Sequence, residues 1–192
     1  MTTLAPTAQT IPDYVAGTWD IDPAHSEVSF LVRHMVVSKV RGRFNDFEGT
    51  IVTGEDPTAS TVKATIAAGS IDTNQEQRDA HVRSADFLDV ENHPTLSFTS
   101  TGLRPNSDHY VLEGDLTIRG VTKPVSLDLE LNGFGPDLHG GTRVGFSAST
   151  EINRQDFGVS YNGPIPGANN AMVLSDKLVL NLEIEAVLRQ AS

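Results

Sequence analysis

The chain has 192 residues, and its 25 Asp and Glu against 14 Lys and Arg give a formal net charge of −11. This acidic balance disfavours a large electrostatic footprint on nucleic acid or on an anionic membrane surface, so we expect small molecules or proteins as partners and no nucleic acid. The chain has no Cys, which excludes disulfides, thiol catalysis and cysteine-bound metal centres.

Residues 1–16 are predicted to be a flexible N-terminal tail, followed by a single domain over residues 17–192. The tail is rich in Thr, Ala and Pro, and the first basic side chain of the chain is Arg33. A secretory signal needs a positively charged start and an apolar run, and neither pattern is found here. No stretch approaches the roughly 18 apolar residues of a membrane span. We therefore expect a cytoplasmic protein.

From Gly17 onward, apolar and polar residues alternate with period two, which predicts strands with one buried face. The first such run places Val28, Phe30 and Val32 on one face. The apolar faces of the later runs are Val62, Ala64 and Ile66; Leu96 and Phe98; Tyr110, Leu112, Leu116 and Ile118; Val125, Leu127, Leu129 and Leu131; Val144, Phe146 and Ala148; and Leu178, Leu180, Leu182, Ile184 and Ala186.

The alternation slips by one residue between Phe44 and Phe47, which predicts a bend at Asn45 and Asp46 if both rings point inward. Turn-forming residues separate the runs at 54–57, 105–108, 120–124 and 133–141. The runs add up to about eight or nine antiparallel strands, a number typical of a closed barrel or a two-sheet sandwich. The sequence therefore predicts an all-β fold.

One segment, residues 73–89, breaks the alternation. Thr73 and Glu76 have the spacing of a capping box, and the stretch from Asn74 to His81 has no β-branched residue, Gly or Pro. This pattern predicts a short helix. A following turn carries Phe87, and we interpret the whole segment as a lid or plug across one opening of a barrel.

A family resemblance rests on several motifs that occur in a fixed order. They are residues 17–26, Arg33-His34, Gly42-Arg43-Phe44, Ile71-Asp72-Thr73 with Arg78-Asp79 and His81, Ser84-Ala85-Asp86-Phe87, residues 114–125 and residues 152–158. Together these motifs resemble the YceI family over about residues 17 to 188. The resemblance implies an eight-stranded antiparallel, lipocalin-like barrel that binds a long isoprenoid chain in its interior. Many members of this family are exported to the periplasm.

The residues alone leave open whether the inward side chains fill the barrel or border a narrow apolar tunnel. The resemblance favours the tunnel. The residues that we predict to contact a ligand are Phe30, Val32, His34, Phe44, Ile66, Arg78, His81, Phe87, Phe98, Leu116, Phe146 and Phe157. Of these, His34, Arg78 and His81 are candidates to hydrogen-bond a quinone or phosphate head group near the lid. Their alternative role is to hold the rim and the lid in place.

Motifs for catalysis or metal binding are weak in this chain. The six His residues include no pair at the i, i+4 spacing, and no Gly-rich phosphate loop or nucleophile elbow is present. We therefore predict no catalytic residue, no metal and no cofactor.

Two functions remain open at this stage. The favoured one is non-enzymatic binding or transport of a long-chain isoprenoid lipid, of the polyprenyl or isoprenoid quinone type. The alternative is an enzyme that acts on a small apolar or lipid substrate through His34 or His81 as acid or base. A homodimer stays open as a second kind of partner.

Overall fold

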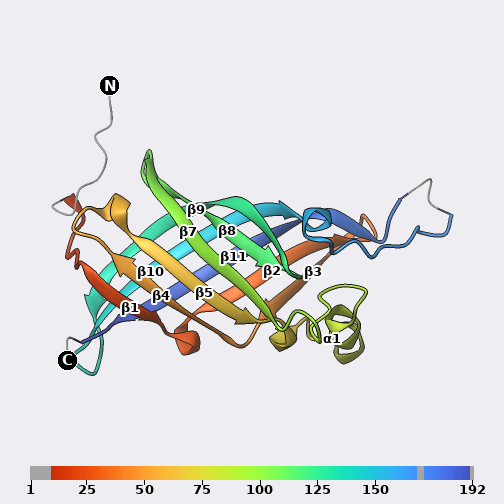
Figure 1. Cartoon of the computed structure of the whole chain (residues 1–192), viewed down its shortest axis with the longest axis horizontal. Helices are drawn as coiled ribbons and strands as arrows, with labels where there is room; N and C mark the ends of the chain where they lie inside the picture. The colour runs from red at the N-terminus through yellow and green to blue at the C-terminus, as the bar shows by residue number, and fades with distance from the viewer. Residues whose placement is uncertain (1–9, 168–170, 191–192) are drawn as a thin grey trace.

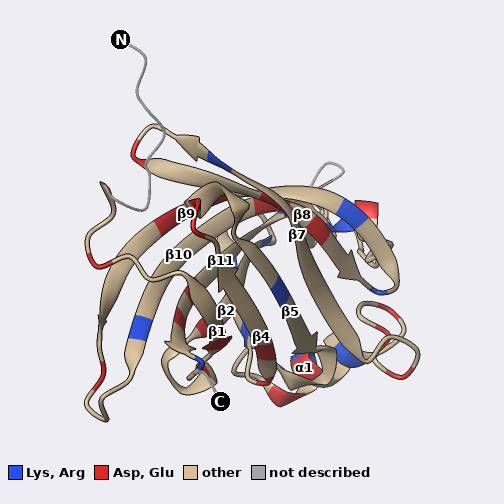
Figure 2. Cartoon of the chain, turned by 60° about the vertical axis from the view of Figure 1, so that its left-hand side comes forward, with Lys and Arg blue, Asp and Glu red and all other residues tan. Residues whose placement is uncertain are grey.

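The chain folds into an elongated antiparallel barrel (Figure 1), seen in a computed structural model that describes residues 10–167 and 171–190. Its strands are β1 (Gly17–Ile21), β2 (Glu27–His34), β3 (Ser38–Phe44), β4 (Phe47–Thr53), β5 (Thr61–Ala67), β6 (Ile71–Asp72), β7 (Thr95–Asn106), β8 (His109–Ile118), β9 (Val121–Pro136), β10 (Thr142–Asn153) and β11 (Leu174–Leu188). Figure 2 shows charged residues as isolated bands along these strands, as expected where only alternate positions face solvent.

The barrel closes because β11 pairs with β10 on one side and with both β1 and β2 on the other. β1 pairs with β4 and β2 pairs with β3, so residues 17–53 form one long hairpin that is bent midway. Counted this way, the barrel wall has eight strands. The predicted eight-stranded antiparallel barrel is therefore confirmed.

The bend predicted between Phe44 and Phe47 is also confirmed. Both rings are buried, and Asn45 and Asp46 lie between the end of β3 and the start of β4. The Asn45 amide donates to the Ser70 carbonyl at 3.1 Å, and the Asp46 carbonyl accepts from the Ala67 amide at 2.9 Å. The connection after β5 thus satisfies the backbone groups that the bend removes from the sheet.

The helix in the predicted segment is α1 (Glu76–Arg83). Its N-cap is Gln75, whose side chain accepts from the Arg78 amide, so the capping box predicted for Thr73 is wrong. The Thr73 amide and hydroxyl instead donate to the buried Asp79 carboxylate at 2.8 and 2.5 Å. Asp79 draws the Thr73 side chain away from the cap because its carboxylate, in the first helical turn, needs donors once buried.

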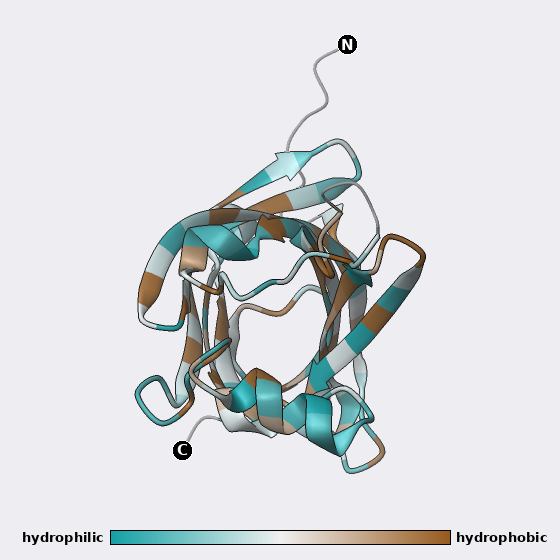
Figure 3. Cartoon of the chain, turned by 90° about the vertical axis from the view of Figure 1, so that its right-hand side faces the viewer, coloured by the Kyte–Doolittle hydropathy of each residue, from teal (hydrophilic) through white to brown (hydrophobic). Residues whose placement is uncertain are grey.

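The segment after α1 packs into the core at one end of the barrel, which we call the helix end. Phe87 and Leu88 are buried in a cluster that includes Ile71, Ile118 and Phe157. Figure 3 looks toward this end and shows α1 along the lower rim of the barrel. Within the described chain, no helix is long and apolar enough to cross a membrane.

Candidate functional site

A cavity of about 190 Å³ lies inside the barrel, and its wall is almost wholly apolar. The inward faces predicted from the alternation form this wall, for example Val62, Ala64 and Ile66 of β5, Leu127, Leu129 and Leu131 of β9, and Leu180, Leu182 and Ile184 of β11. No Lys, Arg, His, Asp or Glu of the described residues lines it. The cavity can therefore hold an apolar molecule but offers no charged group to one.

The strand register places large and small side chains at the same level of the wall. Phe98 pairs with Ala64 on one side and with Leu116 on the other, so a ring stands beside a methyl group. Phe30 pairs directly with Gly42, and its ring occupies the space where a Cβ of that glycine would stand. These small neighbours let the aromatic rings lie against the wall, and at Phe98, which lines the cavity, this leaves the barrel axis open.

Five of the predicted ligand-contact residues line the cavity, namely Phe44, Ile66, Phe98, Leu116 and Phe146. Phe87 and Phe157 instead lie in the cluster at the helix end, and Phe30 packs against that cluster. Val32 and His34 lie further along β2, outside the cavity lining. Contact of any of these residues with a ligand stays a prediction.

Of the three polar residues predicted near the lid, Arg78 and His81 bond within the lid segment itself. The Arg78 guanidinium donates to the hydroxyl and the carbonyl of Thr73, both at 2.7 Å. The His81 Nε2 atom lies 2.7 Å from the Asp86 carboxylate, and its ring contacts the Phe87 ring at 5.0 Å between centroids. Their alternative role, holding the lid, is the one these contacts support.

The floor of the cavity lies at the helix end. Phe44, Leu96, Leu116 and Ile118 belong both to the cavity lining and to the buried cluster there. The opposite end, which we call the tyrosine end, is lined by Ile11, Tyr14, Leu103, Tyr110 and Phe134.

Two residues of the tyrosine end, Ile11 and Tyr14, come from the segment predicted to be a tail. The Tyr14 hydroxyl donates to the Gly54 carbonyl at 2.7 Å, and its ring packs edge-on against Phe134 at 5.3 Å. This part of the segment is therefore anchored on the barrel, while residues 1–9 lie outside the described residues. Two isolated apolar residues three positions apart give no periodicity that a sequence pattern could detect.

Tyr110 also lines the cavity and is absent from the predicted ligand set, although the alternation places it on the inward face. Only 7% of its surface is exposed, and burial raises the pKa of its hydroxyl above the ordinary value of 10. Within the described chain, the Tyr110 and Thr150 hydroxyls are the lining hydroxyls that lack a hydrogen-bond partner. Tyr110 lies at the tyrosine end and Thr150 deeper in the barrel, so each can bond a ligand oxygen at its own depth.

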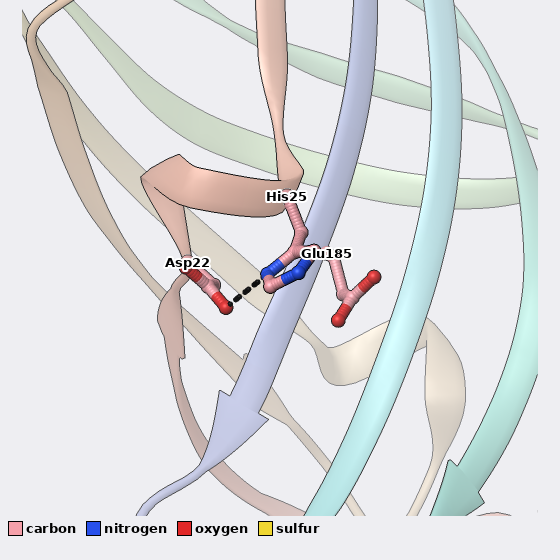
Figure 4. A group of neighbouring side chains, drawn as sticks. All are labelled: Asp22, His25 and Glu185. Carbon is pink, nitrogen blue, oxygen red and sulfur yellow. Dashed lines mark hydrogen bonds and ion pairs between the residues drawn. The ribbon is translucent and has the colours of Figure 1, made fainter. Parts of the chain in front are cut away.

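One cluster of metal-type ligands occurs among the described residues, outside the cavity (Figure 4). Potential ligand atoms of Asp22, His25 and Glu185 lie within 4.8 Å of one another. Arg143, however, donates to the Asp22 and Glu185 carboxylates at 2.7 and 2.5 Å. The Arg143 guanidinium, followed by His25, lowers the pKa of Asp22 to about 2. A cation already neutralises both carboxylates, so the geometry fits an ion-pair network better than a metal site.

Comparison with known proteins gives concordant results. Residues 19–186 match the family described as the YceI-like domain. Protein YceI of Salmonella newport is 42% identical over 166 residues, which cover 84% of this chain and 87% of that protein. The structure of the Campylobacter jejuni YceI protein has a TM-score of 0.69 at 29% identity, covering 82% of this chain and 90% of its own. A polyisoprenoid binding domain from Saccharophagus degradans has a TM-score of 0.68 at 14% identity, covering 91% of this chain and 100% of its own, and thus shares the fold.

Proposed function

Because this chain belongs to the YceI-like family, we propose that it binds a long-chain isoprenoid lipid inside the barrel and carries it without changing it chemically. The observation that carries this proposal is the apolar cavity that extends from the floor at the helix end to the tyrosine end. The Saccharophagus degradans structure, described as a polyisoprenoid binding domain, supports the choice of ligand class.

The size of the cavity favours a slim ligand. Its volume of about 190 Å³ lies below the roughly 300–1,000 Å³ of pockets that hold drug-sized ligands. An eight-stranded barrel has room for one small or narrow molecule. An isoprenoid chain is narrow along its whole length, and we propose that the Phe146 ring moves aside to admit more of it.

The polar contacts favour a neutral head group. No Lys or Arg of the described residues lines the cavity, so a phosphate inside it would stay uncompensated, which is costly in an apolar environment. The Tyr110 hydroxyl can donate to a single oxygen, such as the carbonyl of a quinone or the hydroxyl of a prenyl alcohol. We propose that the head lies beside Tyr110 at the tyrosine end, rather than beside Arg78 and His81 as predicted from the sequence.

The alternative, an enzyme with a His acid or base, has less support. His34 and His81 both lie outside the cavity lining. The titratable groups that line it within the described chain are Tyr14 and Tyr110, and the Tyr14 hydroxyl already bonds to a backbone carbonyl. A general base must reach the proton that it removes, and this arrangement offers no paired acid and base.

Mass spectrometry of an organic extract of the purified chain tests the proposal. We expect one dominant apolar lipid with isoprenoid fragmentation, in up to equimolar amount. The delipidated chain should then take up a menaquinone, followed by quenching of the single tryptophan. That residue, Trp19, is fully buried and packs against Phe134 of the cavity lining at 5.6 Å. If no lipid is extracted and menaquinone causes no quenching, the proposal is wrong.

A further inference from the structure

The hairpin that joins β2 and β3 ends in an exposed apolar tip at the helix end of the barrel (Figure 1). The exposed fractions of Met35, Val36 and Val37 are 42%, 65% and 89%. The Met35 amide donates to the Val173 carbonyl at 2.7 Å, and the neighbouring Met172 is itself 44% exposed. Four apolar side chains therefore face solvent close to one another, although exposure of this kind contributes nothing to folding.

The backbone of this tip is strained. Met35 and Val36 have φ of +50° and +66°, in the left-handed region that Gly, Asn and Asp occupy most readily. A β-branched residue there is an outlier with an energetic cost. Asn at these positions would relieve the backbone, so the turn geometry does not explain why apolar residues occupy them.

The strands beside the tip are basic. Residues 28–44 contain Arg33, Lys39, Arg41 and Arg43 but no Asp or Glu, in a chain whose net charge is −11. Arg43 is paired with Asp72 at 3.2 Å. The other three are exposed, and none has an ion-pair partner in the part of the chain that the structure describes.

The positions of these cations add a second cost. Arg33 and Lys39 are directly opposite each other in the register of β2 and β3, and like charges in that arrangement are destabilising. The acids of the adjoining surface groove are already engaged, since Glu151 pairs with Lys177 and Asp176 pairs with Arg154. The fold thus retains an exposed apolar tip and, on the strands beside it, the cations Arg33, Lys39 and Arg41, which are unpaired in the described chain. Both features lower its stability.

We propose that this hairpin docks the protein on an anionic phospholipid bilayer. Met35, Val36 and Val37 enter the interface, and Arg33, Lys39 and Arg41 lie among the lipid head groups. Apolar side chains beside basic ones bind the interface in this way, and each Lys or Arg near an anionic surface strengthens binding roughly five-fold. A second protein is a poorer fit, because stable protein interfaces bury about 800 Å² on each partner and the tip is only three residues long. The proposal depends on the hairpin alone and holds whatever the barrel carries.

Co-sedimentation of the full chain with phosphatidylcholine vesicles, with and without phosphatidylglycerol, tests this inference. We expect the chain to bind the vesicles that contain phosphatidylglycerol, and we expect high salt to weaken this binding. Replacing Arg33, Lys39 and Arg41 by Gln together should weaken it roughly 100-fold. Val36→Asn should weaken it roughly ten-fold, while thermal stability stays the same or rises because Asn tolerates positive φ.

Leu138→Asn is the matched control. Leu138 is 99% exposed in the turn between β9 and β10, at the tyrosine end, so its loss should leave vesicle binding unchanged. Equal binding to both vesicle types would overturn the proposal. It would also be overturned if Leu138→Asn weakened vesicle binding as much as Val36→Asn does. Concentration-dependent dimerisation that Val36→Asn abolishes, without vesicle binding by the original chain, would show that the tip is a protein interface instead.

Discussion

The ring of Phe98 lies across Gly114 on the neighbouring strand, so closely that a Cβ on this glycine would come within 2.3 Å of the Phe98 Cζ atom. Gly42 has the same relationship to Phe30. Glycine inside a strand is usually unfavourable unless another group needs the space. Here the space lets each aromatic ring lie along the wall. Phe98 lines the cavity, so the open space beside it depends on Gly114, whereas Phe30 packs against the cluster at the helix end.

Gly114→Ala should therefore damage both the fold and the cavity. Its methyl group would also meet the Thr99 carbonyl oxygen at 2.7 Å, which is backbone and cannot rotate away. We expect a loss of about 1–3 kcal/mol in the free energy of unfolding, as for other overpacked cores. Because the Phe98 ring must move toward the axis, menaquinone uptake should fall as well. Urea unfolding and Trp19 quenching measure the two effects.

Gly135→Ala is the control for this substitution. A Cβ on Gly135 of β9 would have no atom within 4 Å, so this variant should keep its stability and its lipid uptake. If Gly114→Ala and Gly135→Ala lost stability and lipid uptake equally, the strand glycines would be needed for their backbone conformation and not for the placement of the aromatic rings.

Phe146→Ala and Ser147→Ala compare the two faces of β10. Phe146 lines the cavity, while the Ser147 hydroxyl donates to the Glu183 carboxylate on the outer face at 2.6 Å. Truncating a Phe in a filled core costs roughly 3–5 kcal/mol. Since the Phe146 ring already borders a cavity, we expect Phe146→Ala to lower the free energy of unfolding of the delipidated protein by less than this. We also expect a marked loss of lipid affinity. Ser147→Ala should lower the free energy of unfolding by no more than about 1 kcal/mol. Urea unfolding with and without lipid measures the stability of both variants. A larger loss for Ser147→Ala would place the strand one residue out of register.

Tyr110→Phe should alter selectivity among lipids. Removing one hydrogen bond of about 0.5–1.5 kcal/mol corresponds to a roughly two- to twelve-fold weaker affinity. We expect this loss for menaquinone, whose ring carries carbonyl oxygens, and no loss for squalene, which carries none. Competition titrations with both lipids measure the difference. Thr150→Val removes the other unpartnered hydroxyl of the lining and should leave both affinities unchanged. If Thr150→Val weakened menaquinone binding and Tyr110→Phe did not, the head group would lie deeper in the barrel, beside Thr150.

The ion pair of Asp22 with Arg143 should make stability depend on pH in acid. The pKa of Asp22 is about 2 in the folded chain against an ordinary 3.8, so between these values the unfolded chain binds more protons. The contribution of this ion pair to the free energy of unfolding is thus fully present above about pH 4, and it declines as the pH falls toward 2. Urea midpoints from pH 6 to pH 2.5 should decline less steeply for Asp22→Asn than for the original chain. Asp115→Asn, which removes an exposed carboxylate that has no hydrogen-bond or ion-pair partner in the described chain, should keep the original slope.

The sequence by itself determined the wall of the barrel. Period-two alternation is a local property, and it identified the inward residues from Val62 to Ile184 because each strand must bury one face. The slip between Phe44 and Phe47 located the bend for the same reason. Five of the predicted ligand contacts line the cavity: four lie on these alternating faces, and Phe44 lies at the bend.

Only the tertiary structure decided where the polar contacts lie. Tyr14 reaches Gly54 across 40 residues of sequence, and no local pattern encodes that approach. His81 and Arg78 suggested a head-group site, yet neighbouring carboxylate and backbone groups of the lid already bond them. Alternation gives a side chain its face but not its partner, because partners across a barrel depend on how distant strands and loops meet.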